Sequence, residues 1–104
     1  LCLHYFWCDL EYSKAFIKAA TKLDGKYKVS LVRKIEEVKT ASTVEELTDC
    51  KKLEGFSNTY RIRIGGYRAF FIFTIVNNTV CFEYLVSRGD AYNKEYMKAL
   101  KTKE

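Results

Sequence analysis

The stretch YRIRIGGYR, residues 60–68, carries the strongest structural signal in the chain. Apolar and basic side chains alternate before the two glycines, which is the pattern of a half-buried β-strand. A glycine pair between two such runs is typical of a two-residue hairpin turn. Arginines therefore stand on neighbouring strands, where like charges that face each other are destabilising. We infer that a polyanion binds between them.

The hairpin continues into a three-stranded antiparallel meander. Residues 59–64 form its first strand, and residues 67–76, which are rich in β-branched and aromatic side chains, form its second. Asn77-Asn78 has the form of another two-residue turn, and residues 79–87 follow as the third strand.

The two turns set the register of the strands and therefore which side chains share a face. Arg63 is expected opposite Arg68, and residue 70 opposite residue 85. A core face is predicted for Ile62, Ile64, Ala69, Phe71, Phe73, Ile75, Val80, Phe82, Tyr84 and Val86. The opposite face is predicted to carry Arg61, Arg63, Arg68, Phe70, Ile72, Cys81, Glu83, Leu85 and Ser87. Strict alternation places Arg88 on the core face, so we expect that the strand ends before it or that a bulge precedes it.

The segment before the meander is predicted to be mainly helical. Residues 1–6 are expected to form a first strand, and Asp9 is expected to cap a helix over residues 10–23. Asp24-Gly25 breaks this helix. A second helix then runs from Tyr27 to Lys39, so that the two form an αα-hairpin.

The remaining segments complete an α+β fold. Residues 43–46 match a capping box and predict a short helical turn, and a last helix is expected from Ala91 to Lys101. The predicted architecture is an antiparallel sheet, made of an N-terminal strand and the three-stranded meander. It packs against the N-terminal helical hairpin and the C-terminal helix.

The composition is that of one folded domain spanning residues 1–104. Hydrophobic residues make up 48% of the chain and aromatic residues 15%, which is enough to form a core. The net charge of +5 favours a nucleic acid, an acidic protein or a membrane surface as the partner. No apolar run reaches the ~18 residues of a membrane helix, and the N-terminus lacks the basic region of a signal peptide. We therefore expect a cytoplasmic protein.

The cysteines and the single histidine show no metal-binding pattern. Cys2, Cys8, Cys50 and Cys81 have irregular spacing and form no CxxC pair. We interpret them as reduced structural thiols. A zinc site is not expected, because His4 lies far from any paired cysteines. We predict no metal and no small-molecule cofactor.

The basic face has the chemistry of a phosphate-binding surface. Arginine suits phosphate because its planar fork donates two hydrogen bonds at once and its charge is permanent. Phe70 on the same face is expected to stack on a base. Lys51 and Lys52 are expected to contact the RNA backbone, with simple solvation as the alternative. The residue pattern alone leaves open that the arginines form an ordinary solvated face.

Two segments resemble the RelE/ParE superfamily of bacterial type II toxins, and its RelE branch more than its ParE branch. They are CKKLEGFSNTYRIRIGGYRAFFIF, residues 50–73, and CFEYLVSRGDAYNK, residues 81–94. The resemblance implies a RelE-like fold and a ribosome-dependent mRNA interferase, which cuts mRNA in the ribosomal A site and is silenced by a cognate antitoxin. By position, it implies an active site formed by Arg61, Arg63, Arg68, Arg88 and Tyr92.

The residue that acts as the general base stays open. Metal-independent cleavage needs a base for the ribose 2′-hydroxyl, stabilisation of the phosphorane and an acid for the 5′-oxygen. Arginine is a poor base because its pKa is above ~12. Tyr92 is the best titratable candidate, although it could simply pack the last helix. Glu83 is a candidate base or an ion-pair partner, and His4 is interpreted as structural.

Two other functions fit the same resemblance. A ParE-like toxin would inhibit DNA gyrase without any RNA chemistry. A catalytically inactive binding module would keep the fold and the charge, and the departures from the family pattern are compatible with it. Some relatives have lysine at the positions of Arg61 and Arg63, and many have histidine at that of Ser87.

Overall fold

The computed structural model describes residues 9–41, 46–47, 49–74 and 79–104. The expected strand at 1–6, with His4, lies outside these residues, as do most of the turn at 43–46 and the turn at 77–78. The strands are β1 (Asp9–Tyr12), β2 (Cys50–Lys52), β3 (Thr59–Ile64), β4 (Tyr67–Thr74) and β5 (Thr79–Ser87). The α-helices are α1 (Lys14–Thr21), α2 (Gly25–Thr40) and α3 (Lys94–Lys103), and a 3₁₀ turn spans Arg88–Asp90.

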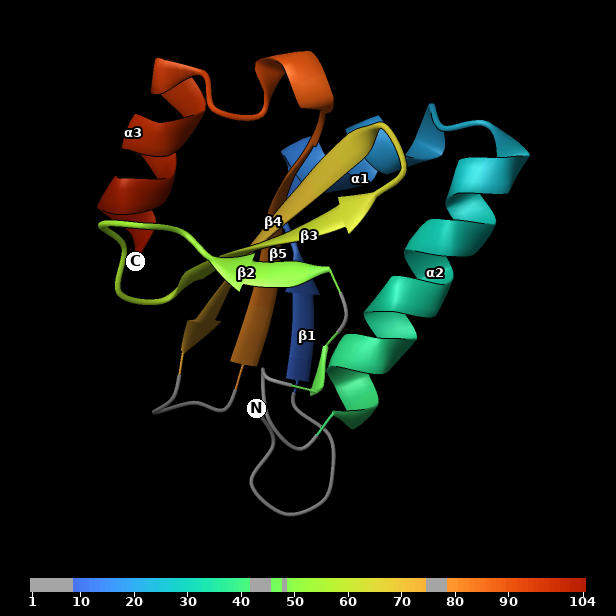
Figure 1. Cartoon of the computed structure of the whole chain (residues 1–104), viewed down its shortest axis with the longest axis horizontal. Helices are drawn as coiled ribbons and strands as arrows, with labels where there is room; N and C mark the ends of the chain where they lie inside the picture. The colour runs from blue at the N-terminus through green and yellow to red at the C-terminus, as the bar shows by residue number, and fades with distance from the viewer. Residues whose placement is uncertain (1–8, 42–45, 48, 75–78) are drawn as a thin grey trace.

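The described strands form one five-stranded mixed sheet in the order β1-β5-β4-β3-β2 (Figure 1). The antiparallel meander β3-β4-β5 is confirmed. The sheet as a whole is not antiparallel as predicted, because β1 pairs with β5 in parallel, from Asp9 with Thr79 to Tyr12 with Phe82. An additional strand, β2, pairs antiparallel with β3 at the edge of the sheet.

The N-terminal helix begins later than predicted. Asp9 starts β1 instead of capping a helix, and the cap is Ser13. The Ser13 hydroxyl accepts a hydrogen bond from the Phe16 amide at 3.0 Å and donates one to the Glu83 carbonyl at 2.6 Å. One side chain therefore caps α1 and ties it to β5. The second predicted helix is confirmed as α2.

The register predicted for β4 and β5 is wrong. Thr74 pairs with Thr79, whereas a two-residue turn at 77–78 would pair residue 76 with Thr79, and a bulge in β5 then shifts the later pairs. The β3–β4 pairs are confirmed, with Arg63 opposite Arg68. Along β5, however, Tyr84 pairs with Phe70 and Phe82 pairs with Phe71, so that Glu83 is an extra residue. Because side chains alternate, one extra residue moves those that follow to the other face. The predicted faces of Tyr84, Leu85 and Val86 are therefore wrong, since Leu85 joins the main core while Tyr84 and Val86 face α3.

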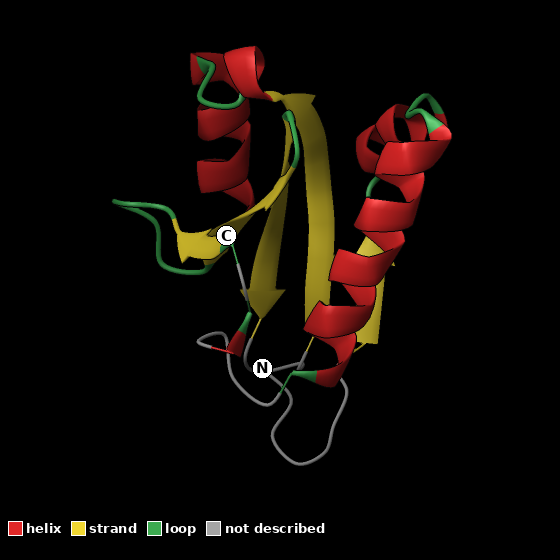
Figure 2. Ribbon diagram, turned by 45° about the vertical axis from the view of Figure 1, so that its right-hand side comes forward, coloured by secondary structure: helices red, strands yellow, loops and turns green. Residues whose placement is uncertain are grey.

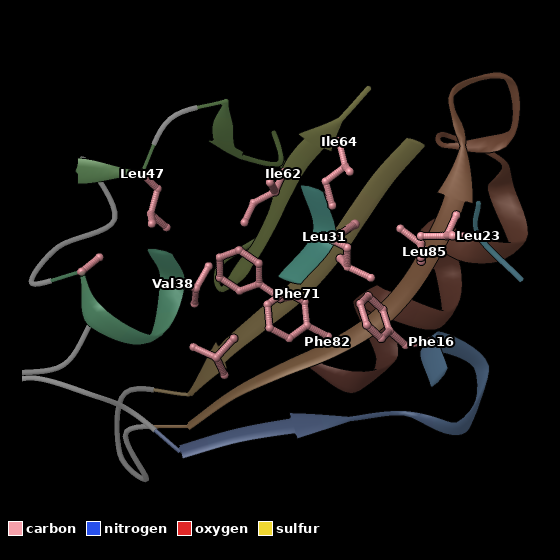
Figure 3. Close-up of a cluster of buried hydrophobic side chains, with 13 residues drawn as sticks. Phe16, Leu23, Leu31, Val38, Leu47, Ile62, Ile64, Phe71, Phe82 and Leu85 are labelled. Carbon is pink, nitrogen blue, oxygen red and sulfur yellow. The ribbon is translucent and has the colours of Figure 1, made fainter. Parts of the chain in front are cut away.

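Helices cover both faces of the sheet, and each face has its own core. Figure 2 shows α2 and α3 on opposite sides of the sheet. The larger cluster lies under α1 and α2, with Phe16, Phe71 and Phe82 at its centre (Figure 3). Phe82 has its ring centroid 5.2 Å from that of Phe16 and 5.5 Å from that of Phe71. The smaller cluster lies under α3 and includes Phe70 and Leu100, both fully buried.

The end of α3 is fixed to the sheet by charged side chains, here called the α3 anchor: Glu83, Lys103 and Glu104. Lys103 Nζ lies 2.7 Å from Glu83 Oε1. The Glu104 carboxylate accepts hydrogen bonds from the amides of Ser57 and Asn58, both at 2.7 Å. It also accepts one from the Thr59 hydroxyl, at 2.8 Å. The anchor therefore holds α3 against β5 and the β2–β3 loop.

Candidate active site and nucleic-acid interface

Four arginines gather on the α3-covered face of the sheet, near the β3–β4 turn. Arg61 and Arg63 come from β3, Arg68 from β4 and Arg88 from the 3₁₀ turn after β5. Together with Tyr92 they line one pocket of about 480 Å³. We call these four residues the arginine cluster. The structure thus brings together every residue that the family resemblance placed in the active site.

The bulge at Glu83 explains how Arg88 reaches this pocket. With the predicted register, Arg88 would have pointed into the main core, opposite Tyr67. The extra residue reverses the alternation, so that Val86 and Arg88 follow Tyr84 onto the face that carries Arg68. Both predicted alternatives are therefore confirmed: a bulge lies five residues before Arg88, and β5 ends at Ser87.

Arg68 is the most buried member of the arginine cluster, with 8% of its surface exposed. Its Nη1 donates hydrogen bonds to the carbonyl oxygens of Gly65 at 3.0 Å and Tyr67 at 2.9 Å. Burial lowers the pKa of Arg68 from its ordinary value, and the positive charges of Arg63, Arg61 and Arg88 lower it further. Both burial and the neighbouring charges disfavour the charged form of the guanidinium, and a bound anion would favour that form.

The other arginines also lack compensation within the described part of the chain. The Nε atom of Arg61 is buried and has no hydrogen-bond partner there. Arg63 stands directly opposite Arg68 in the β3–β4 ladder, an arrangement that costs energy in the absence of an anion. The described lining of the pocket contains no carboxylate. A group of arginines without carboxylate partners has the charge and the donor geometry that suit an anion.

Tyr92 lies at the rim of the pocket rather than in the last helix. The helix predicted from Ala91 begins at Lys94, and Tyr92 stands in the connection between the 3₁₀ turn and α3. It is 59% exposed, and its ring centroid lies 6.2 Å from that of Phe70 in an edge-to-face contact. The reading of Tyr92 as a packing residue of the helix is therefore wrong.

Phe70 requires a correction. Its side chain is fully buried beneath the pocket, in the cluster under α3. A ring with no exposed surface offers no face to a base, so the expectation that Phe70 stacks on RNA is wrong. Its role is to support Tyr92 from below. The alternation of the strand could not indicate this burial, because it depends on α3 covering that face of the sheet.

Lys51 and Lys52 lie beside the arginine cluster because β2 pairs with β3. Lys51 stands opposite Arg61, and Lys52 opposite Tyr60. Both lysines are exposed, and they line a second pocket of about 210 Å³ that shares Arg61 and Tyr92 with the first. Leu53 and Glu54 complete this lining and were not predicted. Both directly follow Lys52 in the segment that carries the family resemblance, which is the signal that could have indicated them.

Glu83, the other described residue that the sequence indicated as a candidate base, lies outside the pocket. Glu83 is 7% exposed and pairs with Lys103, so it is an ion-pair partner rather than a base in the pocket. Cys50 and Cys81 are free thiols, and burial raises the pKa of Cys50 to about 11 and that of Cys81 to about 12. Within the described residues, no histidine, cysteine and carboxylate side chains group as metal ligands. None of the described helices has the length and apolar character to cross a membrane.

Comparison with known proteins places this geometry in a family. No protein-family model matches the chain. Toxin RelE3 of Methanocaldococcus jannaschii is 32% identical over 84 residues, which cover 79% of this chain and 92% of that protein.

Solved structures show the same fold. A chain of the RelB–RelE antitoxin–toxin complex of Methanococcus jannaschii has a TM-score of 0.67 and 27% identity, covering 81% of this chain and 96% of that one. A free variant of the E. coli toxin RelE has a TM-score of 0.72 and 22% identity, covering 93% of this chain and 98% of that one. The chain therefore belongs to the RelE family of toxins.

Proposed function

We propose that this toxin is a ribosome-dependent, metal-independent endoribonuclease that cuts mRNA in the A site and is neutralised by an antitoxin in the cytoplasm. The observation that supports the proposal most is the pocket in which four arginines meet Tyr92 without a carboxylate in its described lining. Such a pocket is suited to a phosphodiester whose negative charge increases during the reaction.

In the proposed reaction, the ribose 2′-oxygen attacks the adjacent phosphorus. The O2′–P bond forms and the P–O5′ bond breaks, while the 2′-hydroxyl proton goes to a base and the 5′-oxygen takes up a proton. Arg61, Arg63 and Arg68 stabilise the negative charge of the phosphorane. Tyr92 is the one described residue of the pocket lining that is not an arginine, and it is assigned proton transfer.

In this proposal, the ribosome positions the mRNA and so compensates for the weak acid–base chemistry of the pocket. The arginine cluster can stabilise charge, but it has few groups that exchange protons near neutral pH. Holding the 2′-oxygen in line with the scissile bond lowers the barrier by several kcal/mol. A ribosome that fixes the mRNA in this geometry would compensate for weak acid–base chemistry. Lys51 and Lys52, next to the pocket, are assigned contacts with the RNA backbone.

A toeprint measurement tests the proposal. The purified protein is added to an mRNA alone and to the same mRNA on ribosomes with an empty A site, and the new ends are mapped. Cuts at A-site codons only in the ribosomal sample are expected. Cuts in both samples would contradict ribosome dependence. If neither sample is cut, a supercoiling assay with DNA gyrase separates a gyrase inhibitor from an inactive binding module.

Antitoxin binding is supported by a second surface. A groove of about 400 Å³ between α1 and α2 is lined mainly by apolar side chains, among them Ile17 and Val32, which are 49% and 55% exposed. The exposed Lys28 is part of its lining and adds a positive charge. This combination suits an acidic amphipathic segment of the antitoxin. Ile17→Asp should weaken antitoxin binding and leave cleavage unchanged, and equal loss of both would contradict this assignment.

A further inference from the structure

The β3–β4 turn holds two members of the arginine cluster through its backbone. The carbonyl oxygens of Gly65 and Tyr67 accept the two hydrogen bonds from Arg68 Nη1, at 3.0 and 2.9 Å. The carbonyl oxygen of Gly66 accepts a hydrogen bond from the Arg88 amide at 2.8 Å. The three consecutive carbonyls of the turn therefore all point to one or other of these arginines. A shift of the turn would displace the Arg68 guanidinium and the start of the 3₁₀ turn together.

The turn is itself supported by an aromatic ring from the opposite side of the sheet. Gly65 has a φ of +58°, and a Cβ atom added there would lie 2.5 Å from Cε1 of Tyr27. The Tyr27 ring also packs edge-on against Tyr67, with 5.0 Å between the ring centroids. Tyr27 belongs to the first turn of α2, and the β3–β4 turn lies at the end of the sheet where α2 begins (Figure 1). One ring thus contacts both the first and the last residue of the segment 65–67.

We propose that Tyr27 is a positioning residue for the arginine cluster. Its ring is absent from the lining of the arginine pocket, so it acts through the turn. The ring fixes residues 65–67, their carbonyls fix the Arg68 guanidinium, and the remaining donors of Arg68, on Nε and Nη2, are left aimed at an anion. The effect of this role on catalysis rests on the proposed cleavage function.

The physical reason is preorganisation. A guanidinium stabilises a phosphorane best when it is already in place, because no reorganisation is then needed at the moment of reaction. A free arginine side chain has many rotamers, and Arg68 is restricted by burial and by its two bonds to the turn. Displacing a catalytic group by about 1 Å can cost on the order of 100-fold in rate. Loss of the Tyr27 ring removes the contact that keeps the turn from making such a shift.

Three variants separate positioning from general stability. Tyr27→Ala removes the ring and Tyr27→Phe keeps it. Ile35→Ala is the matched control, because Ile35 packs into the same core from the same helix, two turns further along. Cleavage on programmed ribosomes is measured at a temperature where circular dichroism shows every variant folded. We expect Tyr27→Ala to lower kcat about 10- to 100-fold with KM changed less than about threefold. Tyr27→Phe and Ile35→Ala should stay within about twofold of the parent protein.

A double variant tests the route through Arg68. If Tyr27 acts by holding Arg68, then Tyr27→Ala should add less than about threefold to the loss already caused by Arg68→Lys. Arg68→Lys is used because it keeps the charge, and so some activity, while giving up the guanidinium fork. If the double variant instead loses activity by the product of the two single-variant losses, the proposal is overturned. An equal loss of kcat in Ile35→Ala and Tyr27→Ala would overturn it as well.

A measurement without substrate keeps this inference separate from the proposed function. A guanidinium held by two carbonyls rotates slowly, so the Nη groups of Arg68 should give separate signals in a nitrogen-15 NMR spectrum. We expect separate signals in the parent protein, Tyr27→Phe and Ile35→Ala, and merged signals in Tyr27→Ala. Separate signals in Tyr27→Ala would overturn the positioning role even if cleavage is observed. Absence of cleavage in the parent protein would refute the function and leave this result to decide the role of Tyr27.

Discussion

The arginine cluster and the α3 anchor are two charged groups on the same face of one sheet, and they differ in how their charges are satisfied. In the anchor, Glu83 and Lys103 lie 2.7 Å apart. The carboxylate of Glu104 accepts two hydrogen bonds from the β2–β3 loop and one from the first residue of β3. In the cluster, like charges face each other and a buried Nε of Arg61 has no partner among the described residues. Charge that is paired maintains the fold, whereas charge that is left unpaired is available to a ligand. Mutations should therefore separate the two regions, with cluster variants losing activity and anchor variants losing stability.

The largest effect is expected at the centre of the cluster. Arg68→Ala should reduce ribosome-dependent cleavage by about 100-fold or more, because it removes a preorganised donor from the phosphorane. The free energy of unfolding should change little, since the loss of two hydrogen bonds to the turn is offset by relief of repulsion from Arg63. Arg33→Ala, which removes an exposed arginine of α2, is the charge-matched control. Cleavage by Arg68→Ala at the parent rate would place the reaction outside this pocket.

The next effect is expected at the anchor and should appear in stability alone. Lys103→Ala leaves the buried Glu83 carboxylate without its ion-pair partner. Since the Lys103 side chain is itself 45% exposed, we expect a loss of only about 1–2 kcal/mol in the free energy of unfolding. Thermal denaturation measures it, with Lys98→Ala on the exposed side of α3 as the control. Equal melting temperatures for the two variants would show that the pair does not stabilise α3.

The same ion pair has a defined pH dependence. Its hydrogen bond to Glu83 raises the pKa of Lys103 above the ordinary value. A raised pKa in the folded state means that the stabilisation is fully present at neutral pH and is lost as the pH rises through the folded pKa. The melting temperatures of Lys103→Ala and the parent protein should therefore converge only at strongly alkaline pH.

A smaller effect with the opposite pH dependence is expected at Glu104. Partial burial raises its pKa, but the hydrogen bonds from Ser57, Asn58 and Thr59 outweigh this and lower the pKa below the ordinary value. The stabilisation is therefore present at neutral pH and is lost as the pH falls through the acidic range. Glu104→Gln should lower the free energy of unfolding by about 1 kcal/mol at neutral pH and by almost nothing in acid. Glu36→Gln, at an exposed position of α2, is the control and should leave the free energy of unfolding unchanged at both pH values. If Glu104→Gln lowers the free energy of unfolding equally at both, the ionised Glu104 carboxylate is not the source of the stabilisation.

The smallest effect is expected in the alkylation rates of the two described thiols. Cys50 reports on the arginine cluster and Cys81 on the α3 anchor. The pKa of Cys50 is raised to about 11 by burial, against the charges of Arg61 and Lys34. That of Cys81 is raised to about 12 by burial and by its hydrogen bond with Glu83. Alkylation at pH 8, followed by peptide mass mapping, should therefore modify Cys50 faster than Cys81, and both more slowly than free cysteine. Arg61→Ala should slow Cys50 further, and faster modification of Cys50 in that variant would contradict this influence.

Much of the fold could be predicted from local patterns, and the failures have a common physical cause. The β3–β4 hairpin and α2 follow from alternation, a glycine turn and helical spacing, all of which act over a few residues. The parallel pairing of β1 with β5, and the three-residue strand β2, depend on partners distant in the sequence. The bulge at Glu83 is stabilised by contacts from Ser13 and Lys103, on two other elements. Such contacts leave no signal in the strand's own alternation.

The candidate site shows the same division. The family resemblance placed five residues together, and the structure brings them to one pocket. Phe70 was misassigned because nothing in its own strand indicates that α3 covers that face. Tyr27 could not be linked to Arg68 by any local pattern, since their connection runs from a helix through a turn on the far side of the sheet.

The position of β5 between β1 and β4 has a consequence for the synthesis of this toxin. Residues 9–12 must wait for residues 79–82 before they can pair, so the sheet has long-range contacts that form slowly. The α1–α2 hairpin packs on strands that follow it in the sequence. Its core therefore cannot form until most of the chain has left the translating ribosome. Arg88 and Tyr92 emerge later still. The arginine pocket of a nascent chain is therefore incomplete until Tyr92 has left the ribosome.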